Sequence, residues 1–281
     1  MENRFAGYNV LLTGATDGIG KAAAKRFTSE GANVCITGRR QEVGQRALQE
    51  IIEAAGRPDC AIFVSGDIKK MEDTQKALDA VLDKWGHLDV LVNCGAKQVG
   101  GTILDMTPED YDEVLGTNIK GIGLACKVCI PELYRSEYPS IINVASINGN
   151  MGVAARTLYG TSKAGIILMS RAMAQDFAPI RVNSISPGFT GSEAMLTNMS
   201  RITGISPEEC ERLTSQGTAL KRMAKPEEQA AVIAFLASKD AAYITGENIV
   251  VDGGALCVGR YDVALESDPR VLAAKAKSKR N

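Results

Sequence analysis

Short apolar runs, rich in β-branched residues, alternate along the chain with longer segments in which apolar residues recur every three to four positions. The short runs are Tyr8–Thr13, Asn33–Thr37, Cys60–Ser65, Asp89–Asn93, Ser140–Ala145, Arg181–Ser186 and Asn248–Val251. The longer segments cover residues 18–30, 41–55, 71–85, 108–135, 158–177 and 226–238. Continuous apolar strands separated by helices are typical of a parallel sheet that is covered on both faces. The pattern predicts an α/β, doubly wound fold around a seven-stranded parallel sheet.

One large domain accounts for most of the 281 residues. We expect residues 1–255 to form a single Rossmann-type domain, because this length supports one well-buried core. Residues 189–222 break the alternation with apolar side chains among polar ones, and such an insert at a sheet's carboxyl edge predicts a lid. The alternative is a poorly ordered loop with one packed helix. Residues 256–281 form a tail with a basic end, interpreted as a solvated chain end rather than a site for an anionic partner.

Composition argues against several classes of protein. The net charge is −1, so we expect no nucleic-acid partner. We also expect no membrane span and no secretory signal, because the chain lacks both a long apolar stretch and a basic, then apolar, start. The seven cysteines are odd in number, and Cys126 and Cys129 are interpreted as core residues rather than a metal or redox pair. These features are typical of a reduced, cytoplasmic protein.

A glycine-rich turn follows the first strand. Strand Tyr8–Thr13 runs into Thr13-Gly-Ala-Thr-Asp-Gly-Ile-Gly20 and then into a helix. Three glycines suit a tight turn, a close approach of backbone N–H groups to a pyrophosphate, and close packing of the helix on the strand. The start of the helix adds N–H donors and a positive dipole end. The position predicts a dinucleotide site rather than a turn without ligand, formed by Gly14, Thr16, Asp17, Gly18, Ile19 and Gly20.

Two arginines, Arg39 and Arg40, follow the second strand. A fold that binds NAD usually places an acid here to hold the ribose 2′-hydroxyl, whereas an arginine suits a 2′-phosphate. This favours NADP over NAD. The alternative is that both side chains only solvate the start of the next helix, and Asp17 places a negative charge near the same end of the cofactor.

Ser146, Tyr159 and Lys163 carry the candidate chemistry. Ser146 closes the fifth strand, and Tyr159 and Lys163 lie four residues apart on one face of the next helix. That helix begins at the carboxyl ends of the strands, where ligands bind in open α/β sheets. A tyrosine ordinarily titrates near about 10. We expect the Lys163 ammonium to lower the pKa of Tyr159, so that the phenol exchanges a proton with a carbonyl or alcohol.

Together the motifs resemble those of the short-chain dehydrogenase/reductase family, over about residues 5–255. The resemblance implies that Tyr159 is the acid/base and that Lys163 lowers its pKa and holds the nicotinamide ribose. It implies that Ser146 orients the carbonyl and that Asn118 positions a water in a proton relay. Further cofactor contacts are implied for Asp67, Ile68, Asn93, Gly95, Pro187, Gly188 and Ser192. No metal is implied, and a homotetramer or homodimer would form through helices 108–135 and 158–177.

The sequence departs from the family pattern at two places. The usual Asn-Asn-Ala-Gly reads Asn93-Cys94-Gly95-Ala96, and Ser192 stands where a threonine is expected. Family position implies a substrate pocket lined by Gln98, Asn148, Met151, Arg156 and Phe189. Phe189 hints at an apolar substrate and Arg156 at an acidic group, although each is equally compatible with packing or solvent exposure. His87, the single histidine, is interpreted as structural.

The sequence thus predicts an NADP(H)-dependent ketone reductase or secondary-alcohol dehydrogenase for a small-molecule substrate. Two alternatives stay open. One is a non-catalytic NADP-binding regulator or scaffold, which need not keep the set Asn118, Ser146, Tyr159 and Lys163. The other is an epimerase or dehydratase that recycles its cofactor.

Overall fold

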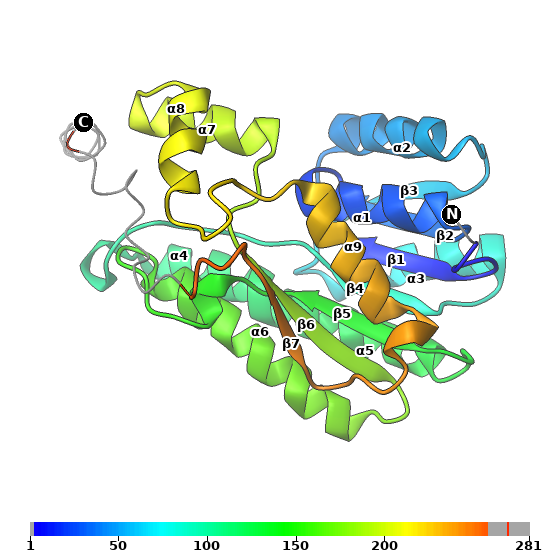
Figure 1. Ribbon diagram of the computed structural model, residues 1–281. Coiled ribbons are helices and arrows are strands. Elements are labelled where there is room, and N and C mark those ends of the chain that lie inside the picture. The colour runs from blue at the N-terminus through cyan, green and yellow to red at the C-terminus, as the bar shows by residue number, and fades with distance from the viewer. Residues whose placement is uncertain (1–2, 258–268, 270–281) are drawn as a thin grey trace.

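Seven parallel strands form one sheet in the part of the chain described by the computed structural model, residues 3–257 and Pro269. The strands are β1 (Asn9–Thr13), β2 (Asn33–Gly38), β3 (Ala61–Ser65), β4 (Val90–Asn93), β5 (Ser140–Val144), β6 (Arg181–Pro187) and β7 (Asn248–Val251). Their order across the sheet is β3-β2-β1-β4-β5-β6-β7 (Figure 1). The order reverses between β1 and β4, which makes that junction the switch point where open α/β sheets bind ligands. The predicted doubly wound parallel sheet is confirmed.

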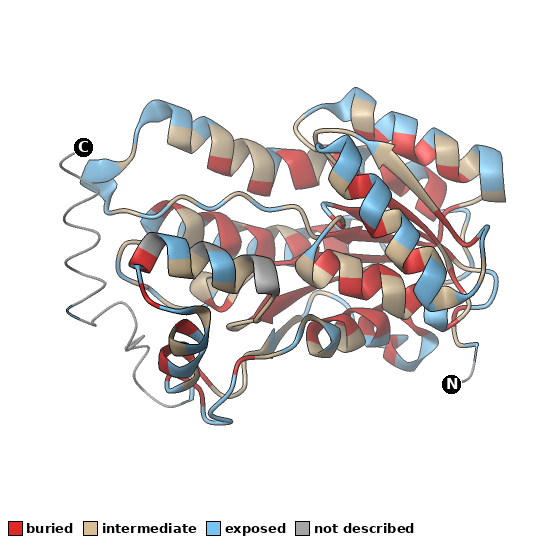
Figure 2. Cartoon of the chain, turned by 90° about the horizontal axis from the view of Figure 1, so that it is seen from above, coloured by how far each residue is buried: buried red, intermediate tan, exposed pale blue. Residues whose placement is uncertain are grey.

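Helices cover both faces of the sheet (Figure 1). They are α1 (Gly18–Ser29), α2 (Gln41–Ala55), α3 (Met71–Trp85), α4 (Pro108–Leu115), α5 (Ile122–Leu133), α6 (Thr157–Asp176), α7 (Glu193–Thr203), α8 (Pro207–Ser215) and α9 (Pro226–Ala237). Helices α1, α2 and α9 pack on one face, and α3, α5 and α6 pack on the other. Figure 2 shows the buried residues on the strands and on the inner faces of these helices.

The strands read as unbroken apolar runs because both of their faces are buried. In β1, Val10 and Leu12 join the core under α1, α2 and α9, whereas Leu11 joins the core under α3, α5 and α6. Successive side chains of a strand point to opposite faces, so a strand between two helix layers needs an apolar residue at every position. All three side chains are completely buried.

The helix predicted over residues 108–135 is interrupted. A π-helical segment, Gly116–Gly121, separates α4 from α5. A Cβ at Gly121 would lie 2.9 Å from Ile68 Cγ2, so a larger residue there would collide with the neighbouring loop. The wider turn contains Asn118, and single π turns often occur at functional sites. Apolar spacing alone did not reveal this interruption, because the segment on each side keeps a helical period.

The insert over residues 189–222 forms two helices, α7 and α8, so the alternative of a loop with one helix is wrong. The hydroxyls of Ser192 and Ser206 cap the two helices by accepting hydrogen bonds from backbone N–H groups three residues later. A small apolar cluster of its own supports the insert; its members are Ile205, Cys210 and Leu213, with Phe189, Leu196 and Met199 packed against them. The basic tail, including Arg270, Lys275 and Lys279, lies outside the described residues.

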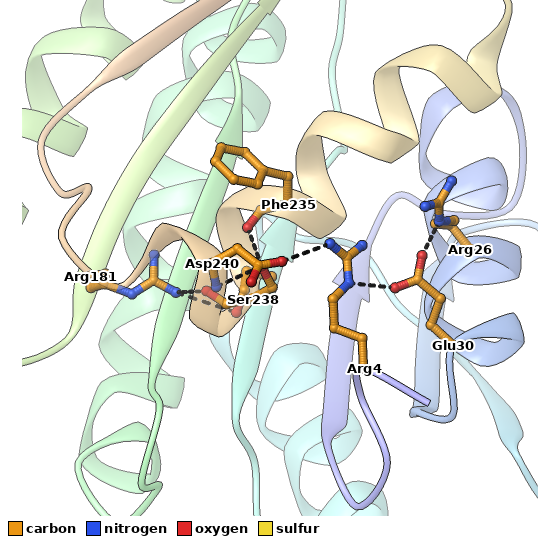
Figure 3. A network of polar contacts seen from close by, with 8 residues as sticks. Arg4, Arg26, Glu30, Arg181, Phe235, Ser238 and Asp240 are labelled. Atoms are coloured by element: carbon orange, nitrogen blue, oxygen red, sulfur yellow. Dashed lines mark hydrogen bonds and ion pairs between the residues drawn. The ribbon is translucent and has the colours of Figure 1, made fainter. Parts of the chain in front are cut away.

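Arg181 closes the end of the sheet opposite the switch point. Its guanidinium donates to five carbonyl oxygens at and after the end of α9, those of Leu236, Ala237, Ser238, Ala241 and Ile244. Figure 3 shows it beside a second network in which Arg4 links Glu30 to Asp240. The last carbonyl groups of a helix lack donors within the helix. Here the Arg181 guanidinium, from β6, donates hydrogen bonds to them. In residues 3–257 no helix has the length and apolar character that a membrane span requires.

Candidate active site

The glycine-rich turn lies against the loop after β4, at the switch point of the sheet. Gly14 has a φ of +63°, and a Cβ on it would lie 2.3 Å from the Cα of Gly95. A Cβ on Gly20 would lie 2.7 Å from the Cα of Ala15. Gly14 therefore permits the turn and its contact with the β4 loop, and Gly20 permits close packing of α1 on the turn. Gly18, with a φ of +52°, faces open space.

Asp17 caps α1, because its Oδ1 accepts a 2.7 Å hydrogen bond from the backbone N–H of Gly18. The Asp17 carboxylate, whose negative charge argued against NADP, thus accepts a hydrogen bond at the start of α1. A cavity of about 700 Å³ opens beside this cap and is also lined by Gly191 and Ser192 at the start of α7. The turn, the N-terminus of α1 and this cavity together fit an anionic, extended ligand such as a dinucleotide.

The ends of β2 and β3 form the part of the site predicted for adenosine. Arg39 and Arg40 are exposed, and a Cβ on the preceding Gly38 would lie 2.6 Å from Thr16 Cγ2. Lys69 pairs with Glu113 of α4. That hydrogen bond is the main reason that the pKa of Glu113 lies below its ordinary value, and the charge of Arg39 contributes. Arg39 therefore lies within electrostatic reach of α4, which adjoins this end of the site.

Asp67 and Ile68 shape the loop after β3. The Asp67 carboxylate accepts a 3.0 Å hydrogen bond from the backbone N–H of Lys69, and its own N–H donates to Asp73. Ile68 lies close to Gly121, whose missing side chain leaves room for it. Both predicted residues are half-buried at the carboxyl edge of the sheet.

Asn93 lies inside the sheet, and its predicted cofactor contact stays a prediction. Its side chain is completely buried; it accepts from Thr13 Oγ1 at 3.1 Å and donates to Asn143 Oδ1 at 2.9 Å. Asn143 in turn donates to Ser170 of α6 at 2.9 Å. The Asn93 amide is thus part of a chain of hydrogen bonds that crosses β1, β4 and β5 and ends at α6. Buried polar groups need such partners, so the side chain of Asn93 supports the site from beneath.

Ser146, Tyr159 and Lys163 meet at the carboxyl ends of β4 to β6. The Ser146 hydroxyl lies close enough to the Tyr159 hydroxyl to act to lower its pKa. The Lys163 ammonium lies 5.6 Å from the centroid of the Tyr159 ring and donates a 2.7 Å hydrogen bond to the carbonyl of Val144. Lys163 is almost completely buried. The predicted grouping of the three side chains is therefore confirmed.

The prediction that Lys163 lowers the pKa of Tyr159 is wrong for the protein as the structure has it. Burial raises the pKa of Tyr159, against smaller opposite effects of the Ser146 hydrogen bond and the Arg156 charge. Burial also lowers the pKa of Lys163 to about 8. Desolvation penalises the charged form of both groups. The Lys163 ammonium is not among the groups that lower the pKa of Tyr159; it donates to Val144 and lies over the face of the ring.

Asn118 joins the β4 loop to α6. Its Oδ1 accepts from the N–H of Lys97 at 2.7 Å, and its Nδ2 donates to the Lys97 carbonyl and to Ser162 Oγ, each at 2.9 Å. Ser162 lies directly before Lys163. Asn118 therefore holds α6 against the loop that carries Cys94 and Gly95, and its predicted water-positioning role stays a prediction.

Asn150 and Asn248 were not singled out from the sequence, yet they hold Ser146 in place. The Nδ2 of Asn150 donates to the Ser146 carbonyl at 3.2 Å and to Ser186 Oγ at 2.7 Å. Asn248 donates to Asn150 Oδ1 at 3.1 Å and accepts from the hydroxyls of Ser184 and Ser186. The two asparagines are 98 residues apart, and each alone looks like an ordinary loop or strand-end residue.

We expect Asn150→Ala to lower kcat about 10- to 100-fold, because a small displacement of a reacting group is enough for such a loss. KM for the cofactor should change little, since Asn150 lies on the Ser146 side of the site. Steady-state kinetics measure both constants. Asn33→Ala is the matched control, because Asn33 donates to Asn9 near the opposite end of the sheet. An equal loss in both variants would contradict a positioning role.

The residues predicted to line the substrate pocket differ in exposure. Gln98 is exposed, whereas Asn148, Met151, Arg156 and Phe189 are half-buried. Phe189 packs against the apolar cluster of the insert, which favours its packing role over substrate contact. Other predicted residues are structural: His87 pairs with Asp89 at 3.1 Å. Cys126 and Cys129 are buried in the core under α5, as predicted.

Comparisons with known proteins agree on one family. A family model described as "Enoyl-(Acyl carrier protein) reductase" matches residues 14–255. A meso-2,3-butanediol dehydrogenase of Serratia marcescens is 35% identical over 90% of this chain and 96% of its own length. A 3-oxoacyl-[acyl-carrier-protein] reductase of Thermotoga maritima is 34% identical over 89% of this chain and 98% of its own. A crystal structure titled short-chain dehydrogenase/reductase, glucose/ribitol dehydrogenase, from Brucella melitensis has a TM-score of 0.80 at 31% identity, covering 91% of this chain and 99% of that one.

Proposed function

The chain belongs to the short-chain dehydrogenase/reductase family, and from that premise we propose that it is an NADP(H)-dependent oxidoreductase with Tyr159 as its acid/base. It interconverts a ketone and a secondary alcohol. The observation that carries the proposal is the meeting of Ser146, Tyr159 and Lys163 at the sheet edge that also holds the glycine-rich turn.

The residues at the switch point fit a dinucleotide. The close contact of Gly14 with Gly95 leaves no room for side chains there, and the capped N-terminus of α1 opens onto a cavity of about 700 Å³. Arg39 and Arg40, exposed at the end of β2, suit a 2′-phosphate. We propose that the turn holds the pyrophosphate and that Lys163 holds the nicotinamide ribose. The nicotinamide, when bound, supplies or accepts the hydride.

The phenol oxygen of Tyr159 carries the proton that is exchanged with the substrate oxygen. Because burial raises the pKa of Tyr159, the phenol stays protonated at neutral pH, which is the form that donates to a carbonyl oxygen during reduction. Ser146, close to the same hydroxyl, donates to that oxygen as negative charge develops. In the oxidative direction the phenolate accepts the alcohol proton.

The named relatives support this choice of chemistry. One is named for butanediol and the other for a 3-oxoacyl group, so each name includes a hydroxyl or an oxo group. We propose a homodimer or homotetramer formed through α4 to α6, supported by the exposed Leu168 on α6 and Tyr134 directly after α5. The cysteines within residues 3–257 are free, and a reducing, cytoplasmic location is proposed on that ground.

The decisive experiment follows NADPH absorbance while the purified protein is offered a panel of ketones and their alcohols. We expect oxidation of NADPH with some ketones and the reverse reaction with the matching alcohols. Product formed without a net change in absorbance would point to an epimerase or dehydratase. Cofactor binding without any product, across the panel, would contradict the proposal and favour a binding protein.

Arg39→Ala should weaken NADPH about 10- to 100-fold while affecting NADH little, because a charge-assisted hydrogen bond to the 2′-phosphate is lost. Fluorescence titration with both cofactors measures the two dissociation constants. Arg46→Ala removes an equal charge from the exposed face of α2 and serves as the control. Equal weakening of NADPH and NADH by Arg39→Ala would exclude a 2′-phosphate site at this arginine.

A further inference from the structure

The 3₁₀ turn Ile147–Gly149, which follows Ser146, lies with its backbone directly against α6. A Cβ on Gly149 would lie 2.7 Å from the carbonyl carbon of Lys163 and 2.8 Å from the amide nitrogen of Ala164. Both atoms belong to the helix backbone, which cannot move aside as the end of a flexible side chain can. A side chain at position 149 would therefore push the turn away from the helix.

Gly160 allows the same contact from the side of α6. A Cβ on Gly160 would lie 2.9 Å from the carbonyl oxygen of Asn148, which is again a backbone atom. Gly160 and Gly149 both have a negative φ, so no left-handed backbone calls for glycine at either position. Within a helix, glycine also lowers stability by about 1 kcal/mol relative to alanine. The close approach of the two backbones is thus the physical reason for glycine at both positions.

The turn fixes both the backbone and the hydroxyl of Ser146. The N–H of Gly149 donates a 2.9 Å hydrogen bond to the Ser146 carbonyl. The N–H of Asn148 donates to Ser146 Oγ at 3.2 Å, so the direction of the hydroxyl depends on the turn. A displacement of the turn away from α6 therefore also shifts the Ser146 hydroxyl.

The same contact includes the reacting end of α6. Tyr159 directly precedes Gly160, and Lys163 supplies the backbone that Gly149 meets. The Lys163 ammonium also donates a 2.7 Å hydrogen bond to the carbonyl of Val144, at the end of β5. The end of β5, the turn and the start of α6 are thus held together. The distance between turn and helix therefore decides where Tyr159 lies relative to the turn.

We propose that Gly149 and Gly160 are positioning residues, which set the separation between the Ser146 hydroxyl and the Tyr159 phenol by letting the turn lie on the backbone of α6. The inference rests on the proposed function of these two hydroxyls. A methyl group at position 149 would lie at 2.7 Å, whereas non-bonded carbon atoms ordinarily keep about 3.5 Å or more. The backbones would have to separate by several tenths of an ångström, and reacting groups must be held to within about 0.5 Å.

Gly149→Ala and Gly160→Ala test the inference, with Gly152→Ala and Gly123→Ala as matched controls. Gly152 lies three residues after Gly149, and Gly123 lies within α5; a Cβ on either would meet nothing within 4 Å. We expect kcat with the best ketone of the panel to fall about 10- to 100-fold in the two test variants. The dissociation constant for NADPH should stay within a few-fold of wild type. Both controls should keep the wild-type constants.

A pH profile separates positioning from general damage to the fold. The Ser146 hydroxyl acts to lower the pKa of Tyr159, and the phenolate is the form that accepts a proton during alcohol oxidation. If Gly149→Ala moves that hydroxyl away, the apparent pKa that governs kcat for oxidation should rise. A loss of folded protein would instead lower the rate by the same factor at every pH.

An unchanged kcat in both test variants, or an equal loss in Gly152→Ala, would overturn the inference. Should Gly149→Ala fail to fold, Gly160→Ala tests the same contact, because alanine favours the helix. If the wild type reduces no ketone, the proposed function fails, and crystal structures of the wild type and of a test variant then decide about the glycines. We expect the Ser146 and Tyr159 hydroxyls to lie about 0.5 Å or more further apart in the variant. An unaltered separation would contradict a positioning role.

Discussion

Tyr159→Phe should lower kcat about 1,000-fold or more while the dissociation constant for NADPH stays within a few-fold of wild type. The phenol lies beside Ser146, and a positioned acid typically contributes about 10²- to 10⁴-fold. The ring stays in place after the substitution because it is held by packing and lies against the Lys163 ammonium. Loss of rate without loss of cofactor separates a chemical role from a structural one.

Steady-state kinetics on the best ketone of the panel, with NADPH binding followed by fluorescence, measure both quantities. Tyr134→Phe is the matched control, because it removes a hydroxyl from an exposed tyrosine at the end of α5. It should keep full activity. A Tyr159→Phe variant that retains more than about a tenth of wild-type kcat would remove this phenol from the mechanism.

Arg181→Met should destabilise the protein by about 3 kcal/mol, since its hydrogen bonds to carbonyl oxygens are charge-assisted and the acceptors are left without donors. The guanidinium is half-buried, and burial lowers the pKa of Arg181. Methionine keeps much of the volume but none of the donors. For a chain of this size the loss corresponds to a fall in Tm of roughly 6 to 10 °C.

Thermal unfolding followed by circular dichroism, with chemical denaturation as a second measure, tests this expectation. Arg46→Met is the control, because Arg46 is exposed on α2. Substitutions of exposed surface residues change stability little, so its Tm should shift by about 1 °C or less. Equal shifts in the two variants would show that Arg181 does not stabilise the end of α9.

The local parts of the site could be predicted because they depend on short spacings. The glycines of the turn and the four-residue spacing of Tyr159 and Lys163 follow directly from helix and turn geometry. The Asn93 side chain could not be placed in this way. Its partners, Thr13 and Asn143, lie 80 and 50 residues away, and only the strand order brings them opposite it.

By itself, the sequence determined the alternation of strands and helices, the covering of the sheet by helices on both faces, and the sheet edge that holds the candidate site. It could do so because periodic burial and glycine conformations are local properties. Tertiary structure alone decided the contact of Asn150 with Asn248, the packing of Gly149 against α6 and the direction in which the pKa of Tyr159 moves. Contacts between distant segments follow from the order and register of the strands. A pKa depends on how far the surrounding atoms exclude water from the group. The spacing of residues along the sequence does not give this burial.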